Sequence, residues 1–183
     1  KTTTYGTVDK GYHSTIDGLT NGDDASIVNL TYGTDGYLSD TKTNHAGDYA
    51  LTTSADALQN YDVTTNTANL HIDKAKLKVT TENKTTTYGT VDKAYHSTID
   101  GLVNGDDSSI VNLTYATDGY LSDTKTNDAG DYDITTGVND LQDYDVTTNT
   151  ANLHIDKAKL KVTTEDKTTT YGTVDKGYHS TID

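Results

Sequence analysis

The chain has 183 residues and a formal net charge of −14 at pH 7, contains no Cys, Met, Trp, Phe or Pro, and uses Lys for all 14 of its basic residues. The lack of Cys excludes a disulfide framework, a Cys-ligated metal centre and thiol catalysis. Because an acidic chain without Arg binds phosphate poorly, we expect no nucleic-acid partner. No apolar run approaches the ~20 residues of a membrane helix, so we expect no membrane insertion. Since the chain begins at Lys1 rather than Met, we expect it to be a segment of a longer protein.

A repeat of 83 residues organises the sequence. The segment Lys1–Thr7 returns at Lys84–Thr90 and again at Lys167–Thr173. Residues 1–83 and residues 84–166 differ at 13 positions. A period of this length is typical of one small domain per repeat and not of a solenoid turn.

Short segments in which apolar and polar residues alternate predict β-strands along each copy. In chain order residues 1–83 offer Val28–Tyr32, Tyr49–Thr52, Ala68–Ile72 and Ala75–Thr81. Thr, Val, Ile and Tyr favour strands, and Gly-Asp or Asn-Gly pairs such as Asn21-Gly22 separate these segments. We expect six or seven short strands per repeat and no helix of consequence.

The fold class follows from the small size of the repeat. A unit of 83 residues without a disulfide must bury its own core, and here only Leu, Ile, Val and Tyr can fill that core. Two packed antiparallel sheets are the simplest solution. The sequence therefore predicts an all-β chain of tandem small β-sandwich domains of the Ig-like kind in an elongated array. The alternative is an array of β-grasp-like repeat domains.

The alternation also predicts where one domain ends. Ala68–Ile72 and Ala75–Thr81 place their apolar residues at positions of opposite parity, so the pattern slips at Asp73-Lys74. We therefore expect the first domain to span 1–73, a complete domain to span 74–156, and a third to begin at 157–183. We call residues 1–73 the first copy and residues 74–156 the second copy.

These boundaries leave two incomplete pieces. Residues 1–73 lack a counterpart of Ala75–Thr81, whereas Ala158–Thr164 repeats that strand without a domain of its own. Because an exposed sheet edge binds an added strand, we expect head-to-tail strand pairing between molecules.

Six short motifs in a fixed order suggest a family. They are Ala75–Thr80, Tyr88–Thr90, Gly101–Asp106, Ala129–Ile134, Tyr144–Val146 and Leu153–Ile155. This pattern resembles the MBG domain of the YGX type, which recurs in tandem in large bacterial surface adhesins. The near-identity of the copies resembles the repeats of lactobacillar cell- and mucus-binding proteins. The resemblance implies an extracellular β-domain attached to the bacterial cell wall, and it supplies no catalytic residues.

Two functions agree with this resemblance. The first is an adhesive repeat that binds mucin or other host glycoprotein glycans, or host cells, weakly per copy and strongly as an array. The alternative is a passive stalk that projects another binding domain. We expect no enzymatic activity: His13 and Ser14 are adjacent, so on a strand they point to opposite faces and cannot act together.

Tyr37 and Tyr120 are the candidate ligand-binding residues. Each lies in the sequence Thr-Asp-Gly-Tyr-Leu-Ser-Asp, just after a turn signal. An exposed Tyr between Asp and Ser is suited to stack on a sugar ring. The alternative is that both residues pack within a hairpin.

The many Asp residues raise the question of a metal site. The densest group comprises Asp118, Asp123, Asp128, Asp131 and Asp133. Calcium prefers six to eight oxygen ligands, but His45 and Ala50 replace two of these acids in the first copy. We therefore expect no metal and no cofactor. We also expect clusters such as Asp106-Asp107 and Asp131–Asp133 to lose charge as the pH falls toward ~5, which would strengthen binding to acidic mucin.

Overall fold

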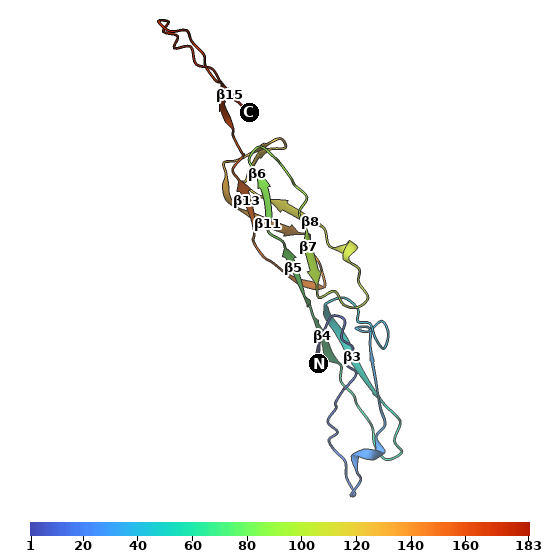
Figure 1. Cartoon of the computed structure of the whole chain (residues 1–183). Helices are drawn as coiled ribbons and strands as arrows, with labels where there is room; N and C mark the ends of the chain where they lie inside the picture. Colours follow the sequence, from blue (N-terminus) through green and yellow to red (C-terminus); the bar gives the residue numbers. More distant parts are fainter. The chain divides into compact units, whose positions relative to one another are not determined.

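The computed structural model describes residues 1–183 as β-strands and loops with two 3₁₀ turns and no α-helix (Figure 1). The all-β prediction is confirmed. Residue contacts group the chain into two units. Unit 1 comprises Lys1–Thr81, His96–Tyr115 and Thr135–Thr150, and unit 2 comprises Glu82–Tyr95, Ala116–Ile134 and Ala151–Asp183. Unit 1 thus joins the first copy to part of the second. None of the helical segments is long and apolar enough to cross a membrane.

The first copy forms one four-stranded sheet in the order β1-β4-β3-β2. Its strands are β1 (Thr2–Thr4), β2 (Leu30–Thr34), β3 (Gly47–Ala55) and β4 (Ala68–Asp73). β2, β3 and β4 pair antiparallel, and β1 runs parallel to β4. Leu51, Leu70 and Ile72 are buried, because alternate residues of these strands face the core.

The second copy repeats this sheet in the order β6-β13-β11-β8. Its strands are β6 (Lys84–Thr87), β8 (Leu113–Ala116), β11 (Gly130–Val138) and β13 (Ala151–Asp156). Ile134, Leu153 and Ile155 are buried here, at the positions of Leu51, Leu70 and Ile72 in the first copy.

The second copy also contains a three-stranded sheet with no equivalent in the first. β5 (Ala75–Thr81) lies between β7 (Ser97–Asp100), to which it is antiparallel, and β12 (Tyr144–Thr148), to which it is parallel. Ala75, Leu77, Val79 and Thr81 are buried on one face of β5. This strand begins at Ala75, as the slip in the alternation predicts.

The sheets are mixed, so the prediction of purely antiparallel sheets is wrong. The pairs β1–β4, β5–β12 and β6–β13 are all parallel. Parallel neighbours need a crossover connection instead of a hairpin, and each of these pairs joins strands that lie far apart in the sequence. Packing as an Ig-like sandwich stays a prediction.

The first copy has fewer strands than the six or seven expected. Residues 14–17 and 61–65, which correspond to β7 and β12, form no strand. No segment of the first copy corresponds to β5. Residues 14–17 and 61–65 therefore have no central strand with which to pair.

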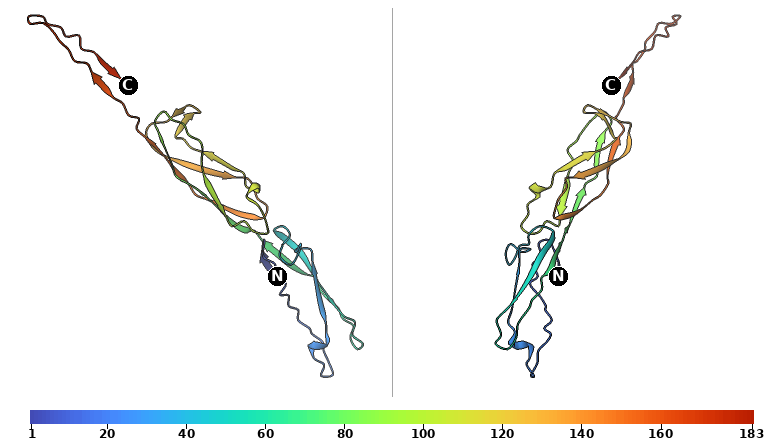
Figure 2. Two further views of the ribbon diagram at one scale, coloured as in Figure 1. Left: turned by 45° about the vertical axis from the view of Figure 1, so that its right-hand side comes forward. Right: turned by 180° about the vertical axis from the view of Figure 1, so that it is seen from behind.

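The remaining elements are short. They are β9 (Tyr120–Ser122) with β10 (Lys125–Thr126), β14 (Val162–Thr164) with β15 (Ser180–Ile182), and the 3₁₀ turns η1 (Ala25–Ile27) and η2 (Ser108–Ile110). Both views in Figure 2 show β14 and β15 side by side as a two-stranded hairpin near the C-terminus.

Candidate functional site

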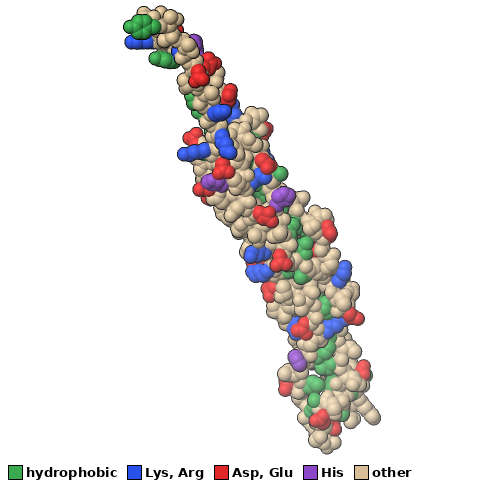
Figure 3. Space-filling view, in the orientation of Figure 1, with side chains coloured by type: hydrophobic (Ala, Val, Ile, Leu, Met, Phe, Trp, Pro, Cys, Tyr) green, Lys and Arg blue, Asp and Glu red, His purple; other side chains and the backbone are tan.

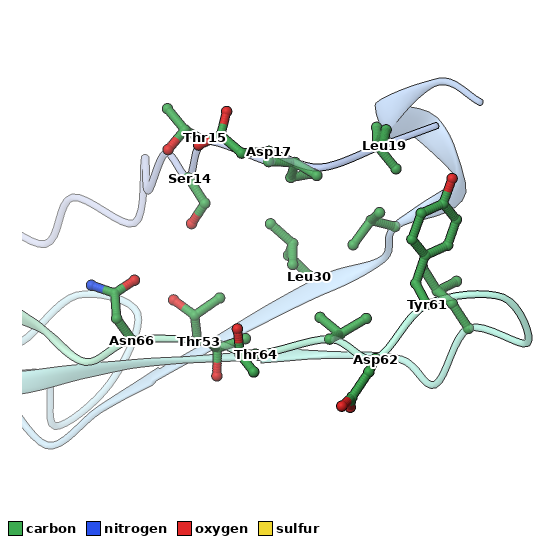
Figure 4. A pocket seen from close by; sticks show the side chains of 15 residues that line it. Ser14, Thr15, Asp17, Leu19, Leu30, Thr53, Tyr61, Asp62, Thr64 and Asn66 are labelled. Carbon is green, nitrogen blue, oxygen red and sulfur yellow. The ribbon is translucent and has the colours of Figure 1, made fainter. Parts of the chain in front are cut away.

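An open groove lies in the first copy at the place that β5 fills in the second. One wall consists of residues 14–19 and the other of residues 61–66, with Leu30 and Thr53 between them. Figure 4 shows Leu30 pointing into the space between the two walls. We call this feature the acceptor groove.

The composition of the acceptor groove suits a strand better than a small molecule. It encloses about 190 Å³, below the ~300–1,000 Å³ typical of small-molecule sites. Apolar side chains of Ile16, Val28 and Leu30 line it, and the two walls belong to no strand ladder. An extended segment can both cover such side chains and pair with the backbone on either side.

Equivalent residues of the two copies differ in burial around this groove. Val111 and Leu141 of the second copy are buried, whereas their counterparts Val28 and Leu58 are partly exposed. The residue types are identical, and the second copy has β5 where the first copy has the groove.

The C-terminal hairpin contains a second segment with the sequence of β5. Ala158–Thr164, which we call the donor segment, has the same sequence as β5. Leu160 is 71% exposed, whereas Leu77 at the same place in β5 is 1% exposed. Apolar side chains are visible on this hairpin in Figure 3. The donor segment therefore presents at its surface the side chains that β5 buries.

A cluster of aromatic and polar side chains connects the two copies within unit 1. The ring of Tyr5 meets the ring of Tyr144, and both hydroxyls donate to Oδ2 of Asp106, at 3.0 and 2.7 Å. The Val103 N–H donates to the Tyr144 hydroxyl at 3.1 Å. Burial raises the pKa of Tyr144 far above its ordinary value, and the hydrogen bond to Asp106 adds to this shift. We call Tyr5, Val103, Asp106 and Tyr144 the joint cluster.

Four further hydrogen bonds link the same two copies. The Thr43 N–H donates to Oδ1 of Asn104 at 3.0 Å, and Nδ2 of Asn104 donates to the Thr43 carbonyl at 3.1 Å. Asp143 accepts from the Ala46 N–H at 2.8 Å and pairs with Nδ1 of His45 at 2.8 Å. The alternation of apolar and polar residues along the sequence did not predict this joint. Three residues of this joint, His45, Val103 and Asp143, lie at positions that differ between the copies.

The order of these elements agrees with a known domain family. The sequence profile of the MBG domain (YGX type) matches residues 1–71 and 77–154, most of the chain. The chain belongs to the MBG domain family of the YGX type. The match to the second copy begins within β5, so an MBG domain includes this strand. No curated protein and no solved structure gives a significant match.

Membership in the family sets a general biological context. MBG domain repeats are typical of bacterial surface proteins. The match is to a repeat domain family, and no catalytic family matches.

Tyr37 and Tyr120 occupy equivalent places in the two MBG copies. Both are half-buried, and their hydroxyls donate to the carbonyls of Asp9 and Asp92 at 2.9 and 2.8 Å. Leu38 and Leu121, the next residues, are 65% and 67% exposed. The bound hydroxyls agree with the packed alternative, and sugar binding by either Tyr stays a prediction.

The acidic residues of the MBG copies form no group of three or more potential metal ligands. Figure 3 shows acidic and basic side chains intermixed on the visible face. The expectation that Asp107 and Asp131 lose charge at mildly acidic pH is wrong. Hydrogen bonds from the Ser109 N–H lower the pKa of Asp107, and those from His154 and Asn152 lower the pKa of Asp131. Donors of hydrogen bonds outweigh neighbouring carboxylates at both residues.

Proposed function

We propose that this chain is a segment of an extracellular, cell-wall-attached array in which MBG copies act as spacers that project another binding domain. The observation that carries the proposal is the joint cluster, in which Tyr5 of the first copy is buried against Tyr144 and Asp106 of the second. A spacer requires a defined joint between successive domains, because a flexible joint lets the array collapse.

Spin labels can test whether the joint is defined. Because the chain lacks Cys, Thr31→Cys and Thr98→Cys introduce the only two labelling positions, both on exposed residues. We expect a narrow distribution of label–label distances that Asp106→Ala broadens. Asp23→Ala is the matched control, since Asp23 accepts a hydrogen bond from Tyr61 as Asp106 does from Tyr144 but lies outside the joint. A broad distribution in the unchanged chain would contradict a spacer role.

The second candidate function is multivalent binding of mucus glycans or host cells, as in an adhesin. The observation that favours it is the exposed Leu38 and Leu121 beside Tyr37 and Tyr120, a feature repeated in both copies. A weak contact repeated along an array gains affinity, because each later contact is intramolecular. Exposed apolar side chains next to aromatic rings suit the apolar faces of sugars.

Binding to immobilised mucin at pH 7.4 and pH 5, each at low and high salt, separates the two functions. We expect an adhesin to bind more strongly at pH 5, because His71 and His154 gain charge on a chain of net charge −14. High salt at pH 7.4 should also help by screening repulsion from acidic glycans. The double variant Leu38→Ser/Leu121→Ser should weaken binding, whereas Leu160→Ser should not. If the chain does not bind mucin under any of the four conditions, the spacer role is the one candidate function that remains.

A further inference from the structure

We propose that the joint between two MBG copies is selective: it accepts a second-type copy after a first-type copy and disfavours two second-type copies in succession. A first-type copy carries the residues of the first copy, and a second-type copy carries those of the second. This inference rests on the proposed spacer function, since it concerns the joint that a spacer requires. It names the kind of neighbour that this joint accepts.

Most of the joint is common to both types of copy. Six of its residues have the same residue type at the equivalent position of the other copy: Tyr5, Gly6, Thr43, Asn104, Asp106 and Tyr144. These residues can therefore join any two copies. Selectivity has to come from the positions at which the copies differ.

The joint contains three such positions. On the side of the preceding copy, His45 of the first type is Asp128 in the second. On the side of the following copy, Val103 and Asp143 of the second type are Thr20 and Asn60 in the first.

Asp143 senses which copy precedes it. Its carboxylate is 12% exposed, so it needs partners that replace water. Both of its partners belong to the preceding copy. Oδ1 accepts a hydrogen bond from the Ala46 N–H at 2.8 Å, and Oδ2 pairs with Nδ1 of His45 at 2.8 Å. The first contact uses backbone that every copy has, whereas the second requires the His of a first-type copy.

A second-type copy in the preceding position reverses this second contact. Its Asp128 takes the place of His45, so a second carboxylate faces Oδ2 of Asp143 and the imidazole is lost. Like charges repel more strongly at a mostly buried site than in water. Specific pairing commonly uses such a repulsive element against the wrong partner. Because near-identical neighbouring domains can dock incorrectly while they fold, this repulsion limits docking between two second-type copies.

The reverse order, a first-type copy after a second-type copy, lacks this repulsion. Asn60 then stands where Asp143 stands in the observed joint, and its amide can donate a hydrogen bond to the carboxylate of Asp128. The sequence follows this order. Residues 167–183 are identical to residues 1–17, with Gly177 where the second copy has Ala94. A segment of the first type therefore follows the second copy.

Val103 adds an apolar contact to the same selection. A Cβ at Gly6 would lie 2.7 Å from both Cβ and Cγ2 of Val103, so the backbone of the preceding copy packs directly on this side chain. Val103 also packs against the buried core cluster. Thr20 of a first-type copy has a hydroxyl in place of one methyl, and this exchange weakens an apolar contact.

A double-mutant cycle tests the selection within this chain. His45→Asp creates the joint of two second-type copies, and His45→Asp/Asp143→Asn creates that of a second-type copy before a first-type copy. We expect His45→Asp to lower the equilibrium constant for folding by at least ~10-fold, and the double variant to regain a value within ~3-fold of the unchanged chain. Asp143→Asn alone completes the cycle. Urea denaturation measures all four chains.

His96→Asp is the matched control, because it makes the same change of charge at an exposed His outside the joint. It should change the equilibrium constant by less than ~2-fold. The selection would be refuted if His45→Asp had no larger effect than His96→Asp. It would also be refuted if Asp143→Asn failed to restore the stability that His45→Asp removes.

The spin labels at Thr31→Cys and Thr98→Cys report on the joint itself. We expect His45→Asp to broaden the distribution of label–label distances and the added Asp143→Asn to narrow it again. A distribution that is narrow in the unchanged chain and equally narrow with His45→Asp would overturn the selection and leave the spacer function intact. A distribution that is broad in the unchanged chain would contradict the spacer function, and this inference with it.

Discussion

The rings of Tyr5 and Tyr144 meet edge to face, with centroids 5.5 Å apart and planes inclined by 79°. Tyr5 belongs to the first copy and Tyr144 to the second, so one buried cluster in unit 1 includes side chains from both. Aromatic pairs in this arrangement contribute ~0.5–1.5 kcal/mol beyond the area that they bury. Neighbouring MBG copies therefore share part of their core.

We expect Tyr144→Phe to lower the free energy of unfolding by about 1–2 kcal/mol, because it removes the hydroxyl that binds Asp106 and the Val103 N–H. Tyr61→Phe is the control, since Tyr61 makes the same kind of hydrogen bonds at a more exposed place. Urea denaturation of both variants measures the difference. Equal losses in the free energy of unfolding would mean that burial in the joint does not strengthen the hydrogen bonds of the Tyr144 hydroxyl.

Leu77→Ala and Leu160→Ala make the same change in the same seven-residue sequence, in β5 and in the donor segment. We expect Leu77→Ala to lower the free energy of unfolding by ~2–5 kcal/mol, because Leu77 is buried. Leu160→Ala should change it by less than ~0.5 kcal/mol at concentrations where the chain is monomeric, because Leu160 is exposed. Thermal unfolding followed by circular dichroism would detect the contrast, and similar losses would show that burial at the two sites is alike.

We expect the pKa of His71 to lie above its ordinary value, because Asp48 accepts a hydrogen bond from Nδ1. Hydrogen bonds from Asn69 and His71 in turn lower the pKa of Asp48. The stabilisation from His71 is present below pH ~6.5 and is lost as the pH rises through the folded-state pKa. That from Asp48 is present above pH ~3.9 and is lost as the pH falls through its folded-state pKa. The pair therefore stabilises the chain most between these limits.

An NMR titration of the histidine rings checks this expectation. Asp48→Asn should move the pKa of His71 down toward ~6.5. His154, which makes the equivalent contact with Asp131, is an internal control and should not move. A pKa of His71 that does not respond to Asp48→Asn would contradict the assigned cause.

Removal of divalent metal ions should not change stability. Individual acids already have partners: Asp123 pairs with Lys93, Asp145 with Lys76, and Asp107 accepts from the Ser109 N–H. We expect thermal melts with and without EDTA to have the same midpoint. A midpoint that falls by many degrees in EDTA would reveal a structural metal ion.

Several features of the fold could be predicted from the sequence because they depend on local alternation. The segment Ala75–Thr81 alternates apolar and Lys residues, and the structure buries its apolar face as the pattern predicts. The slip at Asp73-Lys74 gave the start of β5. The parallel pairing of β5 with β12 could not be predicted, because alternation shows which face of a strand is buried and not which strand lies beside it.

The other features also fall into two groups: those that residue order determines and those that depend on the tertiary structure. The sequence alone determined the repeat and the all-β class, since both are properties of residue order. The tertiary structure decided that Leu77 is buried while Leu160 is exposed, and that Tyr5 is buried while Tyr88 is exposed, although the sequences around each pair are the same. Burial depends on which segments pack against a side chain, and those segments lie far away along the chain.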